Sequence, residues 1–140
     1  MTDLIFLESE NFRLSFDFKV FETDISSPSN TILSVFVSSA GFSASTTMDI
    51  DIKDISTFCN ELQNIYNSLN GEAKIQEPYG NRQCILFSGD KKGHILVSGT
   101  LSSNGANEFW QELKFENCID QTVLPDFLKK LTALSNQYVR

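Results

Sequence analysis

Metal ligands and paired cysteines are scarce in this sequence. His94 is its single histidine, and its three cysteines, Cys59, Cys84 and Cys118, lie far apart in the chain. Without a C-x-x-C pair or an acid–histidine spacing, we expect no metal, and we expect no cofactor either. An odd number of cysteines within apolar patterns indicates reduced thiols in the core of a cytoplasmic protein rather than a disulfide framework.

Long apolar runs and basic residues are also scarce. No run approaches the roughly 18 residues that a membrane-spanning helix needs, and the start, MTDLIFLESENF, does not resemble a signal peptide. Lysine and arginine number 11 against 18 aspartates and glutamates, which gives a net charge of −7. Nucleic acids and anionic membranes both attract cations, so we expect a cytoplasmic protein that binds neither and whose acidity favours a basic partner.

Period-two patterns occupy most of the chain. The segment NFRLSFDFKV (residues 11–20) alternates apolar and polar residues, as does a half-buried strand, and two further strands meet at Ala40 and Gly41. Residues 4–8 can form a short strand, residues 73–81 an edge segment, and residues 82–88, 94–101 and 108–116 a meander. The 12 phenylalanines suit a packed core, and 140 residues suit one domain over residues 1–140.

Two segments change to helical periodicity. Residues 51–71 carry one apolar stripe with Asp51 as a plausible N-cap, and residues 120–138 carry another with Pro125 in the first turn. Six stripe residues are expected to be buried: Phe58, Leu62, Ile65, Phe127, Leu128 and Leu131. The pattern predicts an α+β fold, with an antiparallel sheet of about six to eight strands and two amphipathic helices packed on one face. Both halves read as strands followed by a helix, although no residue-level repeat is present.

His94 lies in the segment SGDKKGHILVSGTL, between two candidate strands. Pairing these strands around GDKKG places Ser88 opposite His94, with Asp90 near. However, the segment has no nucleophile elbow. Its glycines bracket a turn between two strands, whereas a phosphate loop lies between a strand and a helix. We therefore interpret His94 as a turn-flanking residue, dispensable for any activity, and assign no catalytic residue.

The same region carries a family resemblance. The run FSGDKKGHILVSGTL, followed by EFWQELKFE and IDQTVLPDFLKKL, resembles a family of small bacterial domains with a Gly-His strand, a tryptophan-containing strand and a C-terminal helix. Its layout is similar to that of WapI-type immunity proteins, and the match is best over residues 87–131. The resemblance implies neutralisation of a contact-dependent polymorphic toxin by binding, without enzymatic activity.

The tryptophan strand supplies the candidate partner surface. If residues 108–116 form a strand, Phe109, Leu113 and Phe115 face the core, and an outward stripe of Glu108, Trp110, Glu112 and Glu116 remains. An aromatic anchor among acids suits a basic toxin domain, although the same pattern also fits a locally packed tryptophan with solvated glutamates. Two other functions stay open: a small-molecule-binding or enzymatic domain with a pocket between helices and sheet, and an assembly module joined through a sheet edge.

Overall fold

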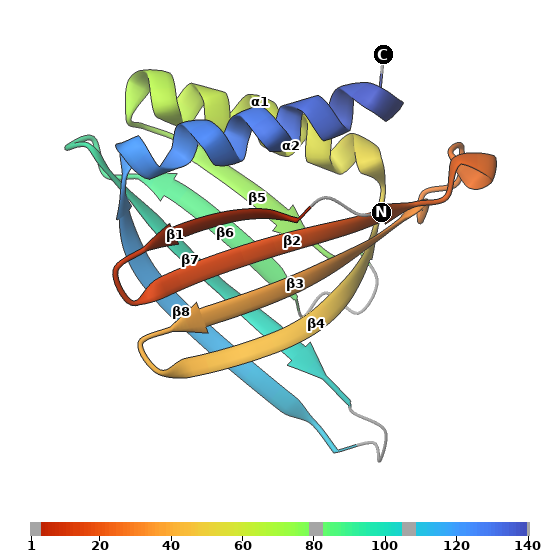
Figure 1. Ribbon diagram of the computed structural model, residues 1–140, viewed down its shortest axis with the longest axis horizontal. Coiled ribbons are helices and arrows are strands. Elements are labelled where there is room, and N and C mark those ends of the chain that lie inside the picture. The colour runs from red at the N-terminus through yellow and green to blue at the C-terminus, as the bar shows by residue number, and fades with distance from the viewer. Residues whose placement is uncertain (1–3, 79–82, 105–108, 140) are drawn as a thin grey trace.

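The computed structural model describes residues 4–78, 83–104 and 109–139 (Figure 1). The first half is an antiparallel meander in the order β1-β2-β3-β4, followed by a helix. Its elements are β1 (Ile5–Ser9), β2 (Phe12–Val20), the short 3-10 helix η1 (Glu22–Asp24), β3 (Thr31–Ser39), β4 (Phe42–Ile50) and α1 (Ile52–Ser68). The second half repeats this plan in the order β5-β6-β7-β8. Its elements are β5 (Glu72–Gln76), β6 (Cys84–Gly89), β7 (His94–Ser103), β8 (Gln111–Asp120), the 3-10 helix η2 (Gln121–Val123) and α2 (Leu124–Tyr138).

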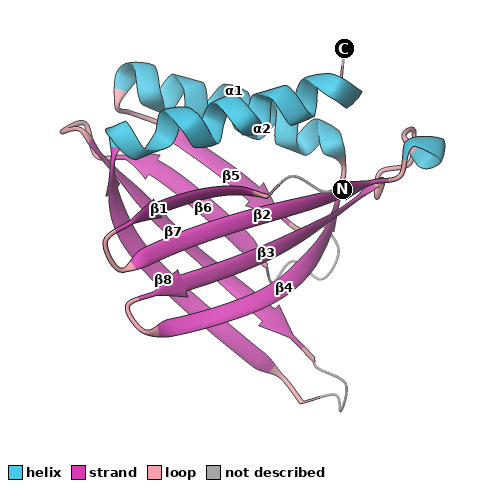
Figure 2. Cartoon of the chain, viewed as in Figure 1, coloured by secondary structure: helices cyan, strands magenta, loops and turns pink. Residues whose placement is uncertain are grey.

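The two sheets face each other with crossing strands, and the two helices lie side by side at one end (Figure 2). Each helix contacts the first strand of the other half: α1 packs on β5 and α2 packs on β1. At the opposite side, β4 approaches β7 and β8. The helices therefore fill the space where the sheets diverge, and the sheets meet directly where no helix separates them.

A chain of phenylalanine rings joins these layers. Phe58 of α1 packs edge-on against Phe87 of β6 at 5.5 Å between centroids, and Phe87 stacks on Phe127 of α2 at 6.2 Å. Phe127 in turn contacts Phe16 of β2 at 5.6 Å. All four rings are almost fully buried. One aromatic core thus links both helices to both sheets, and aromatic pairs of this kind add to the stabilisation from buried area.

The start of α1 is fixed by the buried side-chain amide of Asn30. The Asp51 side chain accepts a hydrogen bond from the Lys53 amide at 3.0 Å, which confirms it as the N-cap. Asn30, fully buried at the end of the β2–β3 loop, donates to Asp51 Oδ1 at 3.0 Å and accepts from the Ile52 amide at 2.8 Å. The loop and the helix start are therefore held together without leaving a buried polar group unsatisfied.

Most of the fold predictions are confirmed. The α+β class, the antiparallel strands, both helices and the burial of all six stripe residues are as expected, and Pro125 lies in the first turn of α2. The eight strands form two sheets, whereas the sequence pattern suggested one. Alternation shows which side of each strand is buried, but not whether a helix or a second sheet covers it.

The cysteines differ from the expectation. Cys59 is buried, and burial raises the pKa of its thiol, partly offset by a hydrogen bond with Thr132. Cys84 is half-buried and Cys118 is exposed, because both point away from the core on the outer face of the second sheet. Only Cys59 is therefore a core thiol.

Candidate partner-binding surface

Strand β8 is an edge strand with an acidic outer side. Leu113 and Phe115 point inward, and Phe115 stacks against Phe12 of the first sheet at 6.1 Å. The ring also lies where a Cβ on Gly99 would stand, so a side chain at that position would displace it. Glu112 and Glu116 point outward, as predicted. The core contacts of Phe115 thus fix which side of β8 carries the acids.

Trp110 lies outside the strand on which the sequence analysis placed it. Strand β8 begins at Gln111, so Trp110 precedes it and is 45% exposed. Its indole Nε1 donates to Glu112 Oε2 at 3.3 Å. The neighbouring Phe109, predicted to face the core, is 70% exposed. The strand is shorter than predicted because alternation continues past the last residue that pairs with β7, Gln111 opposite Ser103.

The predicted stripe is brought together in part. Trp110 and Glu112 are in contact, and Lys114 Nζ lies 3.8 Å from the other carboxylate oxygen of Glu112. Glu116 lies further along β8, opposite Ser98 of β7, and has no ion pair within the described part of the chain. Glu108 lies outside the described residues. Glu116 is therefore the more effective charge for attracting a basic partner, because Lys114 partly neutralises Glu112.

The outer face of the second sheet has an apolar centre beside these acids. Leu96 is 42% exposed and pairs with Cys118, and Leu86 pairs with Ser98, which itself pairs with Glu116. An apolar patch beside charged residues is typical of protein-binding surfaces. Leu96 lies beside β8, opposite Cys118, and Leu86 lies one strand further away, an arrangement that depends on the pairing of β6, β7 and β8 and is not readable from alternation.

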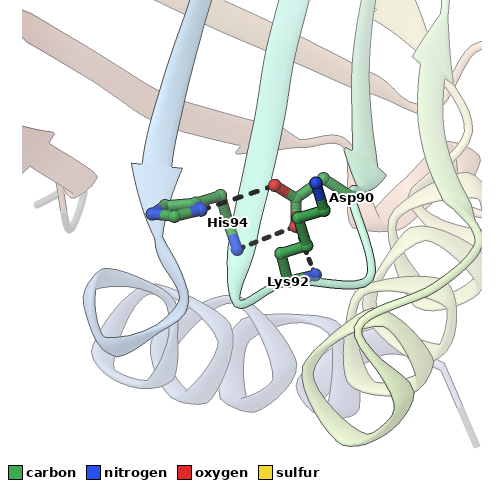
Figure 3. Close-up of polar contacts among 3 residues, drawn as sticks. All are labelled: Asp90, Lys92 and His94. Atoms are coloured by element: carbon green, nitrogen blue, oxygen red, sulfur yellow. Dashed lines mark hydrogen bonds and ion pairs between the residues drawn. The ribbon is translucent and has the colours of Figure 1, made fainter.

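His94 lies at the base of the β6–β7 turn, and its register differs from the prediction (Figure 3). Ser88 pairs with Leu96, and the Asp90 amide donates to the His94 carbonyl at 3.1 Å. A serine–histidine pairing is therefore absent. The register is shifted by two residues, an even number, so every side chain stays on the same face of the sheet as in the predicted pairing, and Ile85, Phe87, Ile95 and Val97 are buried.

The Asp90 carboxylate organises this turn. Its Oδ1 accepts hydrogen bonds from the amides of Lys92 at 2.7 Å and His94 at 3.0 Å, and its Oδ2 lies 3.4 Å from His94 Nδ1. The Lys92 amide is the main reason that the pKa of Asp90 lies below its ordinary value, with His94 contributing less. Because His94 is exposed and its contacts serve the turn, the interpretation of a turn-flanking histidine fits this geometry.

A groove of about 470 Å³ opens between β4 and the start of β8. It is lined by residues 42–46, 101–103 and 111–113. Phe42, 68% exposed, and Ala44 contribute apolar surface from β4, and Leu113 and Glu112 contribute from β8. Thr46 Oγ1 donates to the Ser102 carbonyl at 3.0 Å and joins the two sheets within it. Phe42 thus adds exposed aromatic surface at the side of the molecule that the helices leave open.

Other hollows offer less chemistry. Between α2 and β1, a hollow of about 310 Å³ has Lys130 and Gln137 as its polar lining. On the outer face of the first sheet, Asp17 lines a hollow of about 340 Å³ with hydroxyl side chains, and its Oδ1 accepts no hydrogen bond from the described residues. Within the described ranges, no three metal-ligating side chains gather, and no helix is long and apolar enough to cross a membrane.

Comparison with known proteins gives one family. The model of the immunity protein WapI-like family matches residues 5–139, which include both sheets and both helices. The comparison with curated proteins gives no match.

Proposed function

The chain belongs to the WapI-like immunity protein family, and we propose that it is a non-catalytic binding protein that neutralises a bacterial polymorphic toxin. It acts in the cytoplasm of the cell that produces this chain. The family match over residues 5–139 carries this proposal, because it includes almost the whole described fold. The net charge of −7 supports a basic toxin domain as the partner, since opposite charge accelerates encounter.

We further propose that the toxin domain binds the outer face of the second sheet beside β8. Trp110 serves as its aromatic anchor, with Glu112 and Glu116, and Glu108 if it continues the stripe, as the acidic residues. Leu96, 42% exposed in the middle of this face, adds apolar area that a partner would bury. A standard interface covers roughly 800 Å² on each partner, and we expect the toxin domain to bury about this area here.

Co-expression tests the function directly. The toxin domain encoded beside the gene should arrest growth when expressed alone, and co-expression of this chain should restore growth and retain the toxin in a pull-down. His94→Ala should rescue like the wild type, since no activity depends on that side chain. If His94→Ala folds normally but does not rescue, an enzymatic role replaces the binding role. Absence of a neighbouring toxin, or of any complex with it, would contradict the proposed function.

Substitutions on β8 and at Trp110, just before it, test the surface. Trp110→Ala should raise the dissociation rate about tenfold, because truncating an interface anchor removes its buried contacts. Glu116→Lys should mainly lower the association rate and its salt dependence, and Glu112→Lys should do so less because Lys114 already screens that carboxylate. Glu22→Lys makes the same charge change on the exposed turn between β2 and β3 and serves as the control. If the Trp110, Glu112 and Glu116 variants all bind like this control, the interface lies elsewhere.

A further inference from the structure

Strand β4 is an edge strand with one open row of peptide groups. Among the strands that the structure describes, it pairs only with β3, through a two-residue turn in which Ala40 and Gly41 both have positive φ, 50° and 90°. A turn of this kind makes Ser39 and Phe42 the first hydrogen-bonded pair, so alternate residues from Ser43 onward direct their peptide groups away from β3. The second half of the molecule confirms this phase: Gln83 Nε2 donates to the Thr47 carbonyl at 2.8 Å, and the Asp49 amide donates to Glu77 Oε2 at 3.1 Å.

These two contacts close the far part of the edge and leave the near part open. No hydrogen bond from the described residues reaches the outward peptide groups of Ser43 and Ser45. Residues 42–46 also carry no charge and no proline. Charged residues, proline and bulges are the usual means by which proteins prevent an edge strand from pairing with another chain. This part of β4 is therefore suited to accept an additional strand.

The groove between β4 and β8 lies beside the open edge. Its lining includes both Ser43 and Ser45, together with the apolar side chains of Phe42, Ala44 and Leu113. A strand added to β4 would direct alternate side chains into this groove and the others to the outer face of the first sheet. Glu112 lines the groove on the β8 side, and its carboxylate, which points to the outer face of the second sheet, binds the Trp110 indole. A long cationic side chain of the added strand would meet this carboxylate at the rim of the groove.

We propose that this edge of β4 receives an extended segment of the basic toxin domain. The segment pairs with β4 at Ser43 and Ser45 as a fifth strand of the first sheet. One of its apolar side chains lies in the groove, and one of its lysine or arginine side chains contacts Glu112. The inference rests on the proposed function for the identity of the partner. A second copy of this chain is the less suitable occupant, because each copy carries a net charge of −7 and both grooves would present the same glutamate.

A proline substitution removes the amide that the added strand needs. In Ser45→Pro the outward N–H is lost, and the hydrogen bonds to β3 remain, since those are made by the neighbouring residues. Ser45→Ala keeps the amide and loses only the hydroxyl, so it is the matched control. The probe is the inactivated toxin domain encoded beside the gene, and calorimetry measures its binding. Ser45→Pro should raise the dissociation constant about tenfold or more, and Ser45→Ala should leave it unchanged.

Amide exchange in the wild-type protein gives a second measurement that does not depend on how the variant folds. The Ser43 and Ser45 amides should become protected when the toxin domain binds, and the amide of Asp49, already bonded to Glu77, should change little. A complex with unchanged exchange at Ser43 and Ser45 overturns the strand addition but leaves the proposed function intact. Absence of any complex overturns both. A homodimer of the free chain that Ser45→Pro dissociates identifies a second copy as the occupant and also overturns the inference.

Discussion

The two halves of the molecule follow the same plan but treat the loop between their second and third strands differently. Each half is a four-stranded meander followed by a helix, and each helix packs on the first strand of the other half. In the first half this loop ends at Asn30, which is fully buried against the start of α1. In the second half Asp90 forms a short turn at the surface.

This difference shows that the connection between the second and third strands can contribute to core packing in one half and remain a surface turn in the other. The Asn30 amide makes hydrogen bonds to Ile25, Ser27 and Asp51, and its oxygen accepts from Thr31 and Ile52. Among the described residues, the Asp90 side chain bonds only within its own turn, to residues two and four positions ahead. The end of the β2–β3 loop at Asn30 is therefore part of the folded core, although Glu22–Asp24 of the same loop are exposed, whereas the β6–β7 turn is a local structure on the surface.

The largest expected effect tests whether the two halves unfold together. Leu62 of α1 and Leu131 of α2 are both fully buried. Leu62→Ala and Leu131→Ala should each lower the free energy of unfolding by about 2–5 kcal/mol, through lost apolar burial and the cavity left behind. We predict one cooperative transition in urea for both variants, seen alike by fluorescence and circular dichroism, because each helix packs on the other half. Two separate transitions would mean that residues 1–140 do not form one domain.

A smaller effect separates the two loops. Asn30→Ala should lower the free energy of unfolding by about 2–4 kcal/mol, because the Ile52 amide and the loop carbonyls lose their partner in a buried setting. Asp90→Ala is the matched control in the second half and should lower the free energy of unfolding clearly less, since water can replace the carboxylate at the surface. Urea unfolding of both variants measures the difference. Equal losses would contradict the assignment of the two loops to core and surface.

The smallest expected effect concerns the loss of stability at acid pH. Backbone amides hold the pKa of Asp90, and likewise of Asp120, below the ordinary value of 3.8, whereas burial raises the pKa of Asp54 at the start of α1. A lowered pKa gives stability that is present above the ordinary value and lost as pH falls through the folded value; a raised pKa acts in the opposite direction. The Asp90→Asn/Asp120→Asn variant should therefore lose less stability between pH 6 and pH 3 than the wild type, and Asp54→Asn should lose more. Urea midpoints across this range test both signs.

The sequence alone was sufficient for the local structure. Alternation located the strands, and the six residues that the helical stripes predicted to be buried are all buried, because the period of the apolar residues follows directly from backbone geometry. Asp51 as the N-cap and the outward direction of Glu112 and Glu116 are also readable in this way. The family resemblance, noted from residues 87–131, extends over residues 5–139.

Only the tertiary structure decided which elements and side chains from distant parts of the sequence lie next to each other. The division of the strands into two sheets, the capping of α1 by Asn30 from a distant loop, and the open groove between β4 and β8 all depend on contacts between distant segments. Trp110 was placed on the strand because its parity matched, but strand ends depend on cross-strand partners, and pairing with β7 stops at Gln111. The period of a strand specifies which face a side chain occupies; the element that covers that face is set by the packing of the whole chain.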